Sequence, residues 1–353
     1  MSSSERADIA TISILELDTN DDAMMVWMYP AVDAELQEVL LSRSELREGV
    51  SEAQSLPFRF GKHKDVWHYA LAPRGAELPN AVLPKTAAVT ICLTSSRFNP
   101  EKYAKLLELL AYEYVATGDP LRVMKSVLLV ATTERCATSD KELSWRGGAW
   151  NDQDALLANC SLSEIVALFG QESILLWHAM LLKKRIVVLG SNAAHVQRLV
   201  RALPLLVWHR RDWSILRPHV QLEPVQLADL AKAGVFVAGF TDEAVAGREA
   251  LRDVLVDVDS RRVNISSAAA GDFKMTAHHK SLAKKLMAGA ERGASNEDMV
   301  KVALAKTKEI IGGLKNLAAG SPLTPEVLAA KKLSAADSRF FFNVACVEGF
   351  AEV

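Results

Sequence analysis

The first part of the chain alternates apolar and polar positions in short runs, a pattern typical of half-buried β-strands. The runs IATISILEL and AMMVWMYP are separated by Asp-Thr-Asn-Asp-Asp, a composition that favours a hairpin turn. After this hairpin, Leu36, Val39 and Leu40 recur at helical spacing. We therefore predict a helix at 32–41 and strands at 9–17, 23–30, 57–61, 66–71 and 86–94.

The second predicted strand has no polar face. Strict alternation gives it two apolar faces, one with Met25, Trp27 and Tyr29 and the other with Met24, Val26 and Met28. One face must pack on helices of its own module, and the other is either covered by a second helical layer or offered to a partner. Because Trp and Tyr are enriched in binding hot spots, we predict Trp27 and Tyr29 as partner contacts. The alternative is that both faces are buried.

The next segments change from helix to irregular chain. A helix is predicted at 99–118, because Asn99 can cap its start, Pro100 suits the first helical position and Gly118 can end it. Residues 120–133 are predicted to cross over as a helix or a strand. Residues 137–154 lack periodicity and are rich in Gly, Ser and charge, so they are predicted to be a linker or a mobile loop.

The second half alternates helical and continuously apolar segments. Ser161 and Glu164 form a capping box, and helices are predicted at 172–184 and 192–207. The short apolar runs at 185–190 and 234–240 are typical of strands buried on both faces of a parallel sheet. A hairpin is predicted at 253–265, and the chain after Gly271 is predicted to be helical. This order predicts the α/β class.

Composition narrows the class of protein. The chain has 353 residues, is 50% hydrophobic and 24% charged, and carries a net charge of −2, the profile of a globular protein without a global field for nucleic acid or anionic membrane. Its four cysteines lie far apart, which suits a reducing compartment. The start of the chain is not typical of a signal peptide, and no apolar run approaches the roughly 18–20 residues that span a bilayer. We predict a cytoplasmic protein without direct membrane insertion.

The motifs of common enzyme classes are missing from the sequence. It contains no phosphate-binding G-x-x-x-x-G-K-[ST] loop, no strand followed by G-x-G-x-x-G, no G-x-S-x-G elbow and no H-E-x-x-H. His278 and His279 are adjacent, so on a helix they point about 100° apart and cannot face one metal together. We therefore predict no catalytic, cofactor-binding or metal-binding residues and no bond-making or bond-breaking chemistry. An α/β enzyme with an unseen site ranks far lower.

A basic and aromatic stretch, RALPLLVWHRRDWSILRP, stands out in the second half. Residues 183–217 contain eight basic residues and a single acid, Asp212. Such a patch can attract an acidic protein or phosphates, or it can merely solvate one helix face. Nucleic acid is disfavoured because the tryptophans are embedded in apolar sequence. We predict that the two tryptophans pack in the core. The residues between them, His209, Arg210 and Arg211, are predicted to be exposed and to border a partner surface.

The order of these segments resembles a protein family. LFGQESILLWHAMLLKKRIVVLG, RALPLLVWHRRDWSILRPHV and AGVFVAGFTD together are similar to the core of a DENN domain, and the region before Gly118 is similar to the longin-like module that precedes it. MVWMYP, FNPEKYA, LKKRIVV and LPLLVWHRRDW further resemble the DENN domain-containing protein 10 subfamily. The resemblance covers nearly the whole chain and implies a two-lobed architecture. Its parts would be a longin-like module at 1–118, a linker or crossover at 119–154, an α/β DENN core at 155–266 and a helical part at 267–353.

The resemblance also implies two functions. The first is guanine nucleotide exchange on a Rab-family small GTPase in endosomal trafficking, by binding of the nucleotide-free GTPase. The second is that of a non-catalytic scaffold subunit of an endosomal recycling complex, docked on its coiled-coil subunits. Either would recruit the protein peripherally to late endosomes. Exchange requires differential affinity for two states of the partner, and no catalytic acid or base.

Overall fold

The computed structural model describes residues 8–44, 46, 56–73, 77–150, 157, 159–320 and 322–351. The chain divides into two compact units, residues 1–156 and 157–353, here called the N-terminal and the C-terminal unit. Both combine helices with a five-stranded sheet, so the predicted α/β class is confirmed. The predicted boundaries at 118, 154 and 266 stay predictions.

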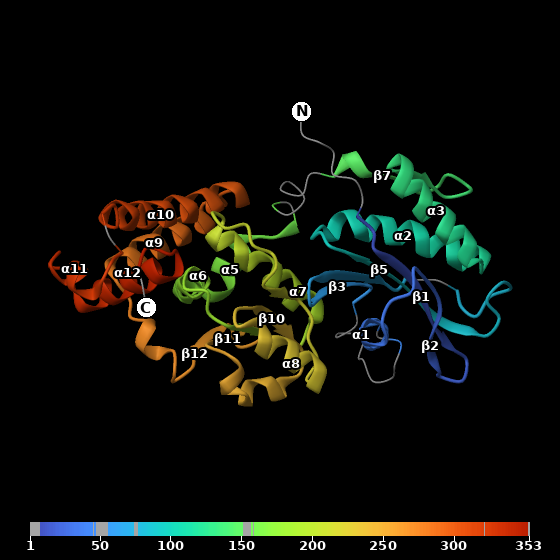
Figure 1. The fold of residues 1–353 in the computed structure, drawn as a ribbon, viewed down its shortest axis with the longest axis horizontal. Helices are drawn as coiled ribbons and strands as arrows, with labels where there is room; N and C mark the ends of the chain where they lie inside the picture. The colour runs from blue at the N-terminus through green and yellow to red at the C-terminus, as the bar shows by residue number, and fades with distance from the viewer. Residues whose placement is uncertain are drawn as a thin grey trace. The chain divides into compact units, whose positions relative to one another are not determined.

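An antiparallel sheet organises the N-terminal unit, with strand order β2-β1-β5-β4-β3 (Figure 1). All five predicted strands are present. Their bounds are β1 Thr11–Asp18, β2 Ala23–Tyr29, β3 Phe58–His63, β4 Val66–Leu71 and β5 Thr86–Ser95. Within the described part of the chain, β2 pairs with β1 alone, so it forms an edge of the sheet.

Helices cover both faces of this sheet. On one face, Leu15 packs in a buried cluster with Leu40 of α1 (Ala34–Ser42), which begins after the cap Asp33. On the other face, the Glu16 carboxylate accepts a hydrogen bond from the hydroxyl of Tyr114 in α2 (Pro100–Thr117). Neighbouring residues of a strand point to opposite faces. The two helices therefore lie on opposite sides, as Figure 1 also shows.

The segment predicted as a linker is largely ordered. Residues 120–133 form helix α3 (Pro120–Thr133), followed by the two-stranded ribbon β6 (Arg135–Ala137) and β7 (Ser144–Arg146) and the turn η1 (Gly147–Ala149). Trp145 is buried, and its indole N–H donates to the Lys102 carbonyl of α2 at 3.1 Å. Trp145, together with the buried Cys136 that pairs with it across the ribbon, anchors the ribbon where the sequence has no periodicity. Residues 151–154 of the predicted linker lie outside the described residues.

A mixed sheet organises the C-terminal unit, with strand order β12-β11-β8-β10-β9. Strand β8 (Ile186–Leu189) lies at the centre, parallel to β10 (Val237–Phe240) and β11 (Val254–Asp257). The predicted hairpin is confirmed as β11 and β12 (Arg262–Ile265). The other edge is β9 (Leu216–Arg217), a two-residue strand that the sequence did not predict.

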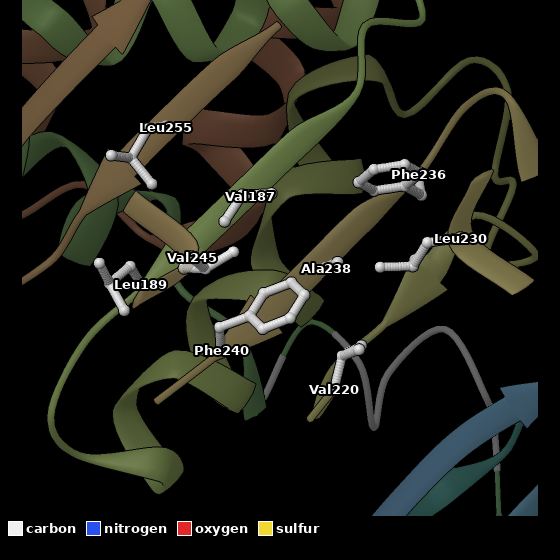
Figure 2. Close-up of a cluster of buried hydrophobic side chains, with 9 residues drawn as sticks. All are labelled: Val187, Leu189, Val220, Leu230, Phe236, Ala238, Phe240, Val245 and Leu255. Carbon is white, nitrogen blue, oxygen red and sulfur yellow. The ribbon is translucent and has the colours of Figure 1, made fainter. Parts of the chain in front are cut away.

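Both faces of this sheet are covered, as the continuously apolar strands predict. On one face, Phe236, Ala238 and Phe240 pack with Leu230 of α8 (Pro224–Ala233) and with η4 (Glu243–Gly247) (Figure 2). The opposite face meets α7 (Ala193–Ala202) at Gly239. A side chain is excluded there, because a Cβ atom at Gly239 would lie 2.4 Å from the Pro218 carbonyl oxygen.

The remaining helices complete the C-terminal unit. The predicted helix at 192–207 ends earlier as α-helix, because the segment around Pro204 continues as the 3₁₀-helix η3 (Leu203–Val207). The other short turns are η2 (Gly170–Glu172), η5 (Glu249–Leu251) and η6 (Ala270–Asp272). The helices are α5 (Leu162–Phe169), α6 (Ser173–Leu181), α9 (Ala277–Glu291), α10 (Asn296–Leu317), α11 (Pro325–Ala329) and α12 (Ala335–Val347).

Candidate partner-binding surfaces

Strand β2 exposes apolar side chains at the edge of the N-terminal sheet. Its seven residues carry no charge. Tyr29 is 52% exposed, Met24 44% and Val26 40%, whereas Trp27 is half-buried. Exposed apolar sheet edges invite pairing with other chains, and proteins commonly charge or cover them. β2 is therefore a candidate contact surface of this unit.

A β-bulge changes which side chains share a face of β2. Ile14 pairs with Trp27 while its neighbour Leu15 pairs with Met25, so Val26 is an additional residue in the strand. Paired residues project to the same face. Trp27 and Tyr29 share one face, as predicted, but Met25 does not join them. The face that Trp27 and Tyr29 share is the one toward α2. The prediction for Met25 was wrong because it assumed unbroken alternation, and Met25 instead packs toward α1.

The stretch around the two tryptophans follows η3 in the C-terminal unit. Trp208 is buried and Trp213 is half-buried, with ring centroids 6.0 Å apart. The prediction of core packing is confirmed for Trp208. The residues between them differ in their surroundings, since Arg211 is exposed whereas the side chains of His209 and Arg210 are 13% and 14% exposed.

Arg210 joins two helices, in contrast to the prediction that it is exposed. Its guanidinium donates to the carbonyl oxygens of Met180 and Leu181, at 2.8 and 2.7 Å, where α6 ends. It also donates to the carboxylate of Glu348, which caps α12 and lies 3.3 Å from the His209 Nε2 atom. The prediction of exposure for His209 and Arg210 was wrong because their acidic partner lies far along the chain.

The pKa of Glu348 is consistent with its hydrogen bonds to His209 and Arg210. Burial of its carboxyl raises the pKa, but hydrogen bonds from His209 and Arg210 outweigh burial and lower the pKa to about 2. Glu348 is therefore a carboxylate at neutral pH, and it compensates the Arg210 charge.

Most of the predicted basic patch is neutralised in the same way. Five of the eight basic residues form ion pairs with acids that lie outside residues 183–217. The sequence of this stretch alone therefore does not reveal the acids that pair with them. The pairs are Lys184–Asp272, Arg185–Asp253, Arg198–Glu164, Arg210–Glu348 and Arg217–Asp229. Most of these basic residues thus stabilise the fold through intramolecular ion pairs.

Arg211 is the member of the predicted triplet that faces solvent. Its backbone has a φ of 48°, in the left-handed region, and its guanidinium lies over the Trp208 ring, 5.1 Å from the centroid. Stacking on a buried ring holds this cation in place while leaving its charge accessible. Of the residues predicted here, Arg211 has the geometry of a partner contact.

The described residues hold no group of three or more His, Cys, Asp or Glu side chains placed to bind a metal ion. No helix within those residues is long and apolar enough to cross a bilayer.

Comparison with known proteins places the chain in a family. A family model described as "SPA: Stabilization of polarity axis" matches residues 159–267. The chain is 35% identical to DENN domain-containing protein 10 of Danio rerio, over 97% of this chain and 98% of that protein. It is 33% identical to the Homo sapiens protein of that name over the full length of both, and 32% identical to that of Dictyostelium discoideum over 96% of this chain and 97% of the other. The chain belongs to the DENN domain-containing protein 10 family.

Membership in the DENN domain-containing protein 10 family confirms the resemblance predicted from MVWMYP, FNPEKYA, LKKRIVV and LPLLVWHRRDW. In the structure MVWMYP lies along β2 and LKKRIVV leads into β8. The family-model match at 159–267 runs from before α5 to beyond β12. Both candidate surfaces, the β2 edge and the turn at Arg211, thus lie on segments that carry the family resemblance.

Proposed function

We propose that the protein is a guanine nucleotide exchange factor, or regulator, of a Rab-family small GTPase in endosomal trafficking. Full-length membership in the DENN domain-containing protein 10 family carries this proposal. The protein would act from the cytoplasm and reach late endosomes by peripheral recruitment through its partners.

Exchange of this kind is a binding reaction. A protein that binds the nucleotide-free GTPase better than the loaded one shifts the equilibrium toward nucleotide release. Such a coupling is typically 1–3 kcal/mol, or roughly 5- to 150-fold in affinity. It requires a shaped surface with fixed anchors, and Arg211, held over Trp208, is a cation of that kind.

A panel of Rab GTPases loaded with fluorescent GDP tests the proposal. Mixing each with the full chain and excess unlabelled nucleotide is expected to accelerate GDP release from at least one Rab. The same Rab, stripped of nucleotide, is expected to bind the chain more tightly than its GDP-loaded form. Unchanged release from every Rab, together with equal affinity for both forms, would exclude exchange activity.

Arg211→Glu is expected to weaken binding of the nucleotide-free Rab by about tenfold, because it places an anion where a fixed cation faces the partner. Arg261→Glu is the matched control, since Arg261 is also exposed and also has a positive φ, of 55°. Titration of labelled Rab measures both variants. If Rab bound Arg211→Glu as tightly as wild type, Arg211 would not be a partner contact. The prediction that His209 and Arg210 border a partner surface would then also be rejected.

The β2 edge favours a second candidate function, a non-catalytic scaffold subunit of an endosomal recycling complex. The observation in its favour is the uncharged strand with exposed Met24, Val26 and Tyr29. A coiled-coil partner could cover these side chains with apolar residues of its own, and aromatic anchors at Trp27 and Tyr29 would fix its position.

Trp27→Asp is expected to abolish coiled-coil binding, because it buries a carboxylate in an apolar contact. Tyr29→Ala, at a more exposed side chain, is expected to weaken binding by at least about tenfold, as hot-spot truncations do. Co-purification with coiled-coil subunits of an endosomal recycling complex measures the loss, and circular dichroism and melting confirm folding. Val82→Asp, an exposed apolar position of the same unit, is the control. Full binding by folded Tyr29→Ala would argue that β2 is not the docking site.

A further inference from the structure

The C-terminal unit has a second open apolar surface that the functions above do not use. A groove of about 740 Å³ lies between α9 and the start of α6. Unlike the closed cluster of Figure 2, this groove opens to solvent, and Met275 at its wall is 38% exposed. Its apolar lining consists of Ile174, Leu175, Met275, Ala283, Met287 and Ala288.

Some of the charged side chains around the groove have hydrogen-bond or ion-pair partners, and others do not. Glu172 is occupied, because its carboxylate accepts a hydrogen bond from the Val263 N–H at 2.8 Å and lies 3.7 Å from Arg262. Lys280 and Lys284 are exposed and stand one turn apart on α9, and their ammonium groups have no hydrogen-bond or ion-pair partner among the described residues. Most cations of the basic stretch, by contrast, are paired. Glu291, at the last turn of α9, also lines the groove. Near the start of α9 the rim therefore offers two ammonium groups that no acid of the described residues pairs with, beside an apolar floor.

The position of Lys280 does not stabilise its own helix. A helix N-terminus favours acidic side chains and disfavours cations. Helix α10 follows that rule, with Glu297 and Asp298 in its first turn and Lys315 in its last. Helix α9 has no acid in its first turn, and Lys280 lies close to its start. Because Lys280 opposes the helix dipole, its presence favours a role outside α9.

We propose that this groove binds an amphipathic helical segment of a partner protein. Large apolar side chains on one face of the segment would fill the groove. Two acidic side chains, also one turn apart, would pair with Lys280 and Lys284, since residues at i and i+4 lie on one side of a helix. Met275 and Met287 supply adaptable side chains for such a contact. This proposal does not depend on Rab exchange or on docking at β2.

A phage-displayed library of 16-residue peptides, selected against the full chain, tests the proposal. The selected peptides are expected to share apolar residues at helical spacing together with Asp or Glu one turn apart. A synthetic peptide of that consensus is expected to bind the double variant Lys280→Glu, Lys284→Glu about tenfold more weakly than wild type, since two attractive pairs become repulsive. Ala288→Trp, which fills the groove, is expected to abolish binding.

The matched control is the double variant Lys308→Glu, Lys315→Glu, which reverses two exposed lysines on α10 away from the groove. It is expected to bind the peptide with an affinity within about twofold of wild type, because exposed charges outside the groove contribute little to binding. Circular dichroism shows whether each variant is folded. A selection without an acidic-apolar consensus, or equal losses in the α9 and α10 double variants, would overturn the proposal. So would unchanged binding to folded Ala288→Trp.

Discussion

Replacing Arg210 with methionine is expected to lower the free energy of unfolding of the C-terminal unit by roughly 2–4 kcal/mol, the range for removing one partner of a largely buried charged network. The variant keeps most of the apolar stem but removes the donors to Met180, Leu181 and Glu348. Two carbonyls at the end of α6 and the partly buried carboxylate of Glu348 then lose the hydrogen bonds from the guanidinium. Denaturant unfolding followed by tryptophan fluorescence measures the change.

Arg211→Met is the matched control for this experiment. It removes the neighbouring guanidinium, but Arg211 is exposed and its contact is the ring of Trp208. We expect a loss of at most about 1 kcal/mol, the value of an exposed cation–π contact. Equal losses in the two variants would contradict the assignment of Arg210 as the tie between α6 and α12. The same reasoning makes Arg211, and not Arg210, the position at which to test partner binding.

The second large effect is a loss of stability in mild acid, caused by two buried histidines of the C-terminal unit. His178 in α6 and His279 in α9 are both fully buried, and their rings are joined by a hydrogen bond of 2.7 Å. The Thr276 N–H donates to Nδ1 of His279 at 3.2 Å. His279 therefore carries its proton on Nε2 and donates it to His178. This arrangement requires both rings to be neutral.

The aromatic surroundings of the pair oppose protonation. Phe273 stacks on His178 with centroids 4.8 Å apart, and Phe340 lies 4.6 Å from His279. Desolvation by burial lowers the pKa of His178 to about 3 and that of His279 to about 4. For His178 the charge of His279 lowers the pKa further, while Asp272, itself paired with Lys184, raises it slightly.

The direction of the pH effect follows from these lowered values. Below its ordinary pKa of about 6.5, each histidine is protonated in the unfolded chain but neutral in the folded one. The unfolded state then binds more protons, so stability falls as pH falls. Each buried histidine is expected to lower the free energy of unfolding by about 2 kcal/mol between pH 7.5 and pH 5. This value follows from about 1.36 kcal/mol for each pH unit below the pKa of the unfolded chain.

Denaturant unfolding at a series of pH values measures the slope of the free energy of unfolding against pH. The double variant His178→Gln, His279→Gln is expected to lose most of it, because glutamine does not titrate in this range. His278→Gln is the control, since His278 is half-buried beside the pair. It removes only the smaller of the two causes that lower the pKa of His279 and leaves burial in place, so it is expected to change the pH dependence of stability much less than the double variant. A double variant with the slope of the wild type would show that other groups cause the acid sensitivity.

Local pattern predicted the elements well where each buries a regular face. Residues 296–317 form α10 within the region after Gly271 that is predicted to be helical, because a cap and an apolar stripe are encoded locally. The apolar runs at 185–190 and 234–240 form the adjacent parallel strands β8 and β10. The sequence did not predict the ribbon of β6 and β7, because a few isolated buried side chains, Trp145 and Cys136 among them, hold it in place and no repeating pattern marks it.

The candidate surfaces show where pattern stops being sufficient. Exposure at Tyr29 follows from an uncharged strand at a sheet edge, and the sequence contains that strand. The face that Met25 occupies depends on the bulge at Val26, which is set by pairing with β1. Likewise, the tie between Arg210 and Glu348 joins residues 138 positions apart.

The sequence by itself determined the α/β class, the positions of most helices and strands, and the family resemblance, because these reside in local periodicity and in short ordered phrases. The tertiary structure alone decided which charges are compensated, which apolar side chains stay open and which histidines are buried together. Those properties depend on neighbours brought together by folding, and a linear pattern does not contain the distance between them.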